Sequence, residues 1–183
     1  MCESQELPFA SASFDAVLST YSLEHFVFPR ESLDEMWRVC RPGGVVLLIS
    51  PAYDDPRLLP PSVSHWTKQQ RRWIILQQAW RQLKRHFIPS HYDFACVTQP
   101  RVLGEAYQSD FDAVHLVSAR EISNFFRAKE GAILFERKRV PRQVTTGPLP
   151  MRLREHARNR LLRLRIGEYA GLNLQIIVQK GKQ

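Results

Sequence analysis

The chain has 183 residues, of which 44% are hydrophobic and 24% charged, and its formal net charge is +8. This length and composition suit one globular domain that can bury a core. The longest apolar run, residues 43–52, is too short for a membrane-spanning helix, which needs roughly 20 residues. The basic excess is uneven: residues 1–60 hold 4 basic and 9 acidic side chains, whereas residues 127–165 hold 12 and 3. The second half therefore presents either a surface for an anionic partner or a solvated basic face.

The three cysteines, Cys2, Cys40 and Cys96, lie far apart and form no CxxC pair. This pattern is typical of a reducing compartment, and we predict no metal site. The first residues are acidic and lack the basic and apolar regions of a signal peptide. We therefore expect a cytoplasmic protein.

The first elements in chain order form a strand–helix–strand unit. Residues 14–20 are almost continuously apolar, which predicts a strand buried on both faces. Residues 30–41 are predicted to form a helix, opened by Pro29 and ended by a Pro-Gly-Gly turn. Residues 45–50 then read as a second fully buried strand. Such a unit implies two parallel strands and a right-handed crossover, so the fold class is α/β.

The later elements combine basic helices with two strands. Residues 65–87 predict an amphipathic helix in which Trp66, Trp73, Trp80 and Phe87 recur every seven residues. We expect this Trp stripe to pack on the sheet rather than to form an aromatic cage. The remaining predicted elements are a helix at 119–129 capped by Ser118, strands at 132–140 and 172–180, and a short basic helix at 152–165. We expect the two strands to pair antiparallel at the sheet edge beside residues 45–50, with residues 141–171 as an excursion between them.

Two quoted stretches carry a family resemblance. "LPFASASFDAVLSTYSLEHF" and "LDEMWRVCRPGGVVLLISP" follow each other in the order found in class I S-adenosylmethionine-dependent methyltransferases of the small-molecule type. The chain resembles this family closely over residues 3–51 and in outline over residues 112–180. The resemblance implies a partial Rossmann-like sheet, with strands equivalent to the family's fourth to seventh. It also implies one domain over 1–183, with basic helical insertions at about 61–92 and 141–170.

The family's fold places its site just past residues 14–20, because such sheets bind ligands outside the carboxyl ends of their strands. By this resemblance the residues that would bind S-adenosylmethionine are Glu3, Ser4, Thr20, Tyr21 and Ser22. Glu24 or His25 would act as a general base on the methyl acceptor. Alternatively, Glu24 orders the loop, and His25 caps the next helix or bonds to the backbone.

The family's glycine-rich turn has no counterpart here, since all eight glycines lie at or after Gly43. We therefore expect an N-terminally truncated domain (a fragment, a mis-called start or a degenerate copy) that binds S-adenosylmethionine weakly or not at all. The strand at 14–20 would then be an open sheet edge.

Three functions follow as hypotheses. The first is a methyltransferase domain acting on a small-molecule acceptor. The second is a non-catalytic α/β remnant whose open sheet edge binds a partner chain or a second copy of itself. The third is a basic module that binds a nucleic acid or a membrane surface.

Overall fold

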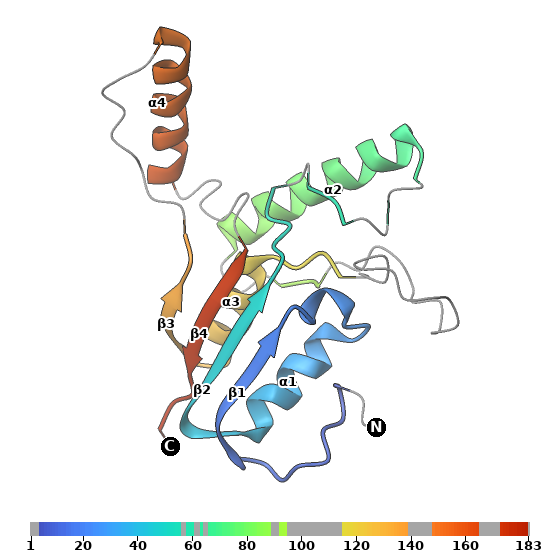
Figure 1. The fold of residues 1–183 in the computed structure, drawn as a ribbon, viewed down its shortest axis with the longest axis vertical. Helices are drawn as coiled ribbons and strands as arrows, with labels where there is room; N and C mark the ends of the chain where they lie inside the picture. Colours follow the sequence, from blue (N-terminus) through green and yellow to red (C-terminus); the bar gives the residue numbers. More distant parts are fainter. Residues whose placement is uncertain are drawn as a thin grey trace.

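The computed structural model describes residues 4–55, 58–60, 63, 66–88, 92–94, 115–138, 148–164 and 173–182. Its elements are β1 (Phe14–Thr20), the short 3-10 helix η1 (Leu23–His25), α1 (Pro29–Val39), β2 (Cys40–Ser50), α2 (Lys68–Phe87), α3 (Ala119–Ala128), β3 (Ala132–Glu136), α4 (Leu149–Arg163) and β4 (Leu174–Gln179). The four strands form one sheet in the order β1-β2-β4-β3 (Figure 1).

Strand pairing confirms the predicted topology. β1 pairs in parallel with β2, and α1 is the crossover between them. β4 pairs antiparallel with β2, and β3 pairs antiparallel with β4 at the edge of the sheet. The fold is therefore α/β, with the strand order expected for the last four strands of the methyltransferase sheet.

β2 begins at Cys40, five residues earlier than predicted, because the Pro-Gly-Gly turn is a bulge inside the strand. Cys40 is the partner of Phe14, whereas the next pair joins Ala16 to Val45. Gly43 has a φ of +78°, which favours glycine. A Cβ on Gly44 would lie 2.8 Å from the carbonyl oxygen of Asp15. The two glycines therefore let the chain leave α1 and pass close to β1.

Helices α1 and α3 pack on the same face of the sheet. The core includes Val46 and Leu48 from β2 and Ile176 and Val178 from β4, all at most 1% exposed. Trp37 of α1 and Phe126 of α3 meet over this face, with ring centroids 5.3 Å apart. Burial of this face is the main apolar contribution to stability among the described residues.

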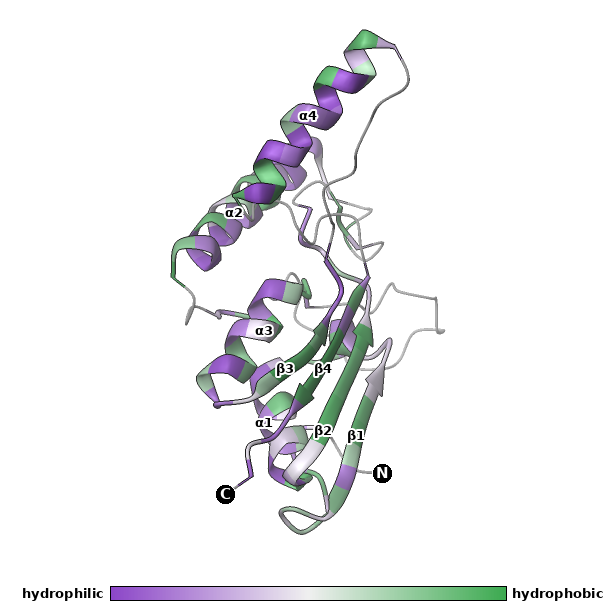
Figure 2. Ribbon diagram, turned by 90° about the vertical axis from the view of Figure 1, so that its left-hand side faces the viewer, coloured by the Kyte–Doolittle hydropathy of each residue, from purple (hydrophilic) through white to green (hydrophobic). Residues whose placement is uncertain are grey.

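The opposite face of the sheet is partly exposed, so the prediction that β1 and β2 are buried on both faces is wrong. Strand register aligns Leu18, Leu47, Ile177 and Phe135 in one row across all four strands. Leu18 is 63% exposed and Phe135 48% exposed. Figure 2 shows hydrophobic strands, with α1 and α3 on one side of the sheet. Among the described residues, this outer face has no helical cover, and β1 is an edge strand.

Helix α2 forms where predicted but turns its aromatic stripe outward. It begins at Lys68, after a capping box in which Thr67 and Gln70 each accept a hydrogen bond from the other's backbone. Trp73 is 63% exposed and Trp80 58% exposed, so the prediction that the Trp stripe packs on the sheet is wrong. Only Trp66, which precedes the helix, packs against the core.

Helix α4 lies within the predicted excursion between the last two strands, and it begins at Leu149 rather than 152. Its side chains are mostly exposed, and Leu162 is its one buried residue. Figures 1 and 2 place α2 and α4 at the end of the sheet toward which β1 and β2 run. None of the helices in the described segments has the length and hydropathy needed to cross a membrane.

The open outer face generates the first testable prediction. Replacing Leu18 by Lys adds a charge to an exposed position on the edge strand, where lysine opposes edge-to-edge association. We expect Leu18→Lys to change the free energy of unfolding by no more than about 0.5 kcal/mol and to reduce self-association in sedimentation velocity.

Leu48→Lys is the matched control, because Leu48 lies on the covered face and is 0% exposed. It should destabilise the chain by more than about 3 kcal/mol, through an unpaired buried charge. Equal destabilisation by the two substitutions, measured by urea unfolding, would contradict a one-sided sheet.

Candidate functional site

The corner after β1 is built by one strained residue and a short hydroxyl contact. Tyr21 has a φ of +49°, in the left-handed region, and its amide donates to the Ile49 carbonyl at 2.7 Å. The hydroxyl oxygens of Ser19 and Ser22 lie 2.7 Å apart. Backbone strain of this kind in a non-glycine residue costs about 1–3 kcal/mol and is found preferentially at functional sites. The turn directs residues 23–25 across the carboxyl end of the sheet.

Glu24 is buried and holds the strand ends together. Its side chain accepts a hydrogen bond from the Ser50 hydroxyl at 2.8 Å, where β2 ends. Its backbone carbonyl accepts from the His115 amide at 2.9 Å. The residue is 1% exposed, so an acceptor molecule in solvent does not reach its carboxylate in this conformation. The geometry fits the alternative in which Glu24 orders the loop.

His25 is the member of the predicted pair that faces solvent. Its side chain is 28% exposed, and its Nε2 lies 3.9 Å from Glu24 Oε1. It lines a surface pocket of about 300 Å³ together with Ser4, Gln5 and residues 26–28. The structure therefore brings Glu24 and His25 together as a buried carboxylate beside a reachable imidazole.

The residues predicted to bind the cofactor form only part of a site. Glu3 lies outside the described residues. The Ser4 hydroxyl lies 2.8 Å from the Ser32 hydroxyl, beside the pocket. Thr20 and Tyr21 are exposed, and Ser22 is half-buried and paired with Ser19. No glycine precedes Gly43 in the sequence, so the described segment from Ser4 to β1 and its corner holds no glycine-rich turn that could supply backbone donors. The described corner alone does not fit S-adenosylmethionine.

An ion pair on α1 holds the segment that precedes β1. Arg38 donates to Glu35 from Nε at 2.6 Å and to the carbonyl oxygens of Phe9 and Leu7 at 2.8 and 3.1 Å. Glu35 in turn accepts from the Leu7 amide at 2.9 Å. The Arg38 hydrogen bond and the Leu7 amide lower the pKa of Glu35 to about 2. This contact fixes the "LPF" segment against α1, a role that the sequence analysis missed.

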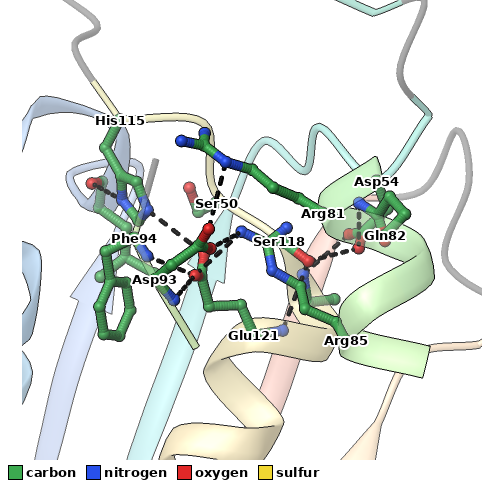
Figure 3. A network of polar contacts seen from close by, with 12 residues as sticks. Ser50, Asp54, Arg81, Gln82, Arg85, Asp93, Phe94, His115, Ser118 and Glu121 are labelled. Carbon is green, nitrogen blue, oxygen red and sulfur yellow. Dashed lines mark hydrogen bonds and ion pairs between the residues drawn. The ribbon is translucent and has the colours of Figure 1, made fainter. Parts of the chain in front are cut away.

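A larger buried network, also missed, joins α2 and α3 near the end of β2 (Figure 3). Arg85 of α2 donates from Nη2 to Asp93 at 2.6 Å and to Glu121 at 3.0 Å. Glu121 Oε1 also accepts from the backbone amides of Asp93 and Phe94, at 2.7 and 2.5 Å. The Nε2 atom of His115 lies 3.7 Å from Oε2, the other carboxylate oxygen of Glu121. The pattern Ser118-x-x-Glu121 signals a helix start, but nothing local indicates Arg85 as a partner.

Asp54 supplies the second half of this network. It accepts from the Ser118 hydroxyl at 2.7 Å and from the Ala119 amide at 2.8 Å, at the positive end of α3. Burial raises the pKa of Asp54, against the effect of these hydrogen bonds. Together with the Arg85 contacts, Asp54 fixes the first turn of α3 against the segment after β2.

The buried ion pair yields the second prediction. Removing Arg85 leaves the Glu121 carboxylate buried beside fewer compensating donors, so Arg85→Met should destabilise the chain by about 3 kcal/mol. The double variant Arg85→Met/Glu121→Gln should recover part of this loss, since no buried charge is then left without its cation. Urea unfolding of the parent chain, the single variants Arg85→Met and Glu121→Gln, and the double variant measures the coupling free energy between the two side chains. Strictly additive effects would contradict the pairing.

The third prediction concerns acid stability. Burial by itself raises the pKa of Glu121, but Arg85, His115 and the Phe94 amide lower it from 4.5 to about 2. A carboxyl whose folded pKa is depressed stabilises the fold above its unfolded value and loses that contribution as the pH falls. Glu121 should therefore contribute about 3 kcal/mol at neutral pH that disappears between roughly pH 5 and pH 2.

The measurement for this prediction is urea unfolding at stepped pH. Glu121→Gln should flatten the dependence between pH 5 and pH 2, whereas Glu130→Gln, on the exposed turn after α3, should leave it unchanged. Parallel curves for the parent chain and Glu121→Gln would contradict the assigned pKa.

Comparison with known proteins shows which family the first residues of the chain resemble. Residues 1–48 match the family described as methyltransferase domain. The demethylmenaquinone methyltransferase of Clavibacter sepedonicus is 44% identical over 46 residues, which are 25% of this chain and 19% of that protein. The ubiquinone/menaquinone biosynthesis C-methyltransferase of Blochmanniella floridana is 36% identical over 53 residues, covering 29% and 21% of the two chains. The matched segment therefore spans about a fifth of these relatives.

Among solved structures, a SAM-dependent methyltransferase from Methanosarcina mazei aligns with a TM-score of 0.46 and 15% identity, covering 99% of this chain and 66% of that chain. Residues 1–48 are thus similar in sequence to the methyltransferase domain family and to the quinone methyltransferases within it.

Proposed function

We propose that this chain forms the acceptor side of a methyltransferase site for a small molecule. The observation that carries the proposal is the corner after β1, where a reachable imidazole lies beside a buried carboxylate at the carboxyl end of two parallel strands. This end is where open α/β sheets bind ligands. The names of the curated relatives suggest a quinone-like ring as the acceptor.

His25 is the proposed general base in this site. It lines the pocket, and histidine exchanges protons near neutral pH. Glu24 acts as a positioning residue: the Ser50 hydroxyl fixes its carboxylate, and Glu24 Oε1 lies 3.9 Å from the Nε2 atom of His25. S-adenosylmethionine supplies the methyl group when it is bound. The chain's own contribution is to orient the acceptor and to take up its proton.

The cofactor side requires a further segment. The candidate residues among those described are Ser4, Thr20, Tyr21 and Ser22. They offer two or three hydrogen bonds, each contributing about 0.5–1.5 kcal/mol. Immobilising the ligand opposes this gain. A dissociation constant of roughly 1 mM needs about 4 kcal/mol, so we propose that the 183-residue chain binds S-adenosylmethionine no more tightly than that.

The fourth prediction tests this function in two stages. Calorimetric titration of the 183-residue chain with S-adenosylmethionine should give no micromolar binding. Joining the chain to the segment that precedes the matched region in the Clavibacter sepedonicus relative supplies, in one polypeptide, the part of the domain where the family resemblance implies a glycine-rich turn. We expect this chimera to bind the cofactor. Micromolar binding by the 183-residue chain alone would contradict the proposal that the cofactor side of the site requires a further segment.

In the chimera, His25→Gln should lower methyl transfer to a demethylated quinone supplied in its reduced, hydroquinone form by about 10²–10⁴-fold, the usual contribution of general acid–base catalysis. Cofactor affinity should be unchanged. His156→Gln is the matched control, since His156 is exposed on α4. Equal activity of His25→Gln and His156→Gln would overturn the role assigned to His25.

A second candidate function is partner binding through β1. Its support is the open edge strand and the apolar row on the outer sheet face. A second copy or a partner chain would pair with this edge. We also propose a cytoplasmic location, because the three cysteines are scattered in the sequence and Cys40, the cysteine among the described residues, is a buried free thiol.

A further inference from the structure

The outward face of α2 carries a continuous stripe of large apolar side chains. Its members, spaced three or four residues apart, are Trp73 at 63% exposed, Leu76 at 62%, Trp80 at 58%, Leu83 at 47% and Phe87 at 72%. We call this set the α2 stripe. Contiguous apolar surface of this size is unusual on a soluble domain and marks an interaction site.

The buried network fixes the orientation of α2, so the α2 stripe does not turn inward. The inward face holds Ile74, Gln78 and Arg85, which are at most 6% exposed. Arg85 is bound to Asp93 and Glu121, and Gln82 donates to Asp54 at 3.4 Å. Rotating the helix to bury the α2 stripe would break these contacts and expose the buried ion pair. The helix thus has a polar inner face and an apolar outer one.

Basic residues surround the α2 stripe and acids do not. Residues 61–92 contain six Lys or Arg and no Asp or Glu. Arg72 and Lys84 flank the stripe, and both are exposed. The Lys84 ammonium lies 5.7 Å from the centroid of the Trp80 ring. Exposed tryptophan beside lysine and arginine is the composition of helices that lie in the interface of an anionic bilayer.

Helix α4 repeats this pattern at the same end of the molecule. Its exposed apolar side chains are Leu149, Met151, Leu153, Leu161 and Leu164. Its basic residues are Arg152, Arg154, Arg158, Arg160 and Arg163, with Glu155 as the one acid. Both helices lie beyond the carboxyl ends of β1 and β2, where the candidate site is (Figure 1).

We propose that α2, supported by α4, docks this chain on the surface of an anionic membrane. The stripe inserts at the level of the headgroups, and the flanking cations contact lipid phosphates. A nucleic acid would use the cations but leave five large apolar side chains in water. Docking turns the end of the sheet that holds the pocket toward the bilayer. The proposal does not rest on methyl transfer, since membrane binding is measured without cofactor.

The test is co-sedimentation of the 183-residue chain with phosphatidylcholine vesicles that contain phosphatidylglycerol, against vesicles of phosphatidylcholine alone. We expect preferential binding to the anionic vesicles, a blue shift of tryptophan fluorescence and quenching by lipids brominated on their acyl chains. The double variant Trp73→Ser/Trp80→Ser should bind at least tenfold more weakly. The charge variant Arg72→Glu/Lys84→Glu should bind more weakly and respond less to salt.

Matched controls separate docking from general effects of charge and hydropathy. Leu18→Ser/Leu134→Ser removes exposed apolar side chains from the sheet, and Arg41→Glu/Lys182→Glu reverses two exposed charges at the opposite end of the sheet. Both should bind the vesicles as the parent chain does. All variants alter exposed residues, and their circular dichroism and urea unfolding should match the parent, which confirms that they fold.

Three outcomes would overturn the proposal: no binding to anionic vesicles, unchanged binding by Trp73→Ser/Trp80→Ser, or binding without a fluorescence shift. Tight, salt-dependent binding to duplex DNA combined with no vesicle binding would assign the basic surface to nucleic acid instead.

Discussion

Burial of one face of the sheet is the constraint on which the described structure depends. Side chains alternate along a strand, so each strand has one set of residues for each face. Val46, Leu48, Ile176 and Val178 belong to one set, and α1 and α3 cover them. The other set contains Leu18 and Phe135, which are largely exposed. The described helices thus cover one of the two apolar faces that the strands provide, and the other face stays partly exposed together with the edge of β1.

The same parallel pairing positions the candidate site. Because β1 and β2 run in one direction, their carboxyl ends meet, and Glu24 reaches Ser50 although 26 positions separate them. The His115 amide then bonds to the Glu24 carbonyl. His25 is left at the surface beside the pocket. The parallel pairing therefore places a fixed carboxylate beside a reachable imidazole, and the proposed acceptor site rests on this arrangement.

How far the sequence predicts this structure depends on whether the signal is local. The strand–helix–strand unit and the final hairpin are correct because apolar runs and the Pro-Gly-Gly turn are local signals. The orientation of α2 is wrong because an amphipathic pattern does not tell which face turns inward. That choice depends on Glu121, 36 positions from Arg85, because its carboxylate binds Arg85 and so holds that one side of the helix against the core. Likewise, continuous apolar strands predicted burial on both faces, whereas the described helices cover one.

Hydrogen exchange of the backbone amides tests the one-sided, open-edged sheet most directly. β2 and β4 each have a neighbour on both sides, so their amides should be the most protected in the chain. β1 bonds only to β2, and its amides that point away from β2 should exchange at nearly the rate of exposed backbone, in alternation with protected ones. Uniform protection of β1 at the level of β2 would contradict the account, because it would require a neighbour already paired with that edge.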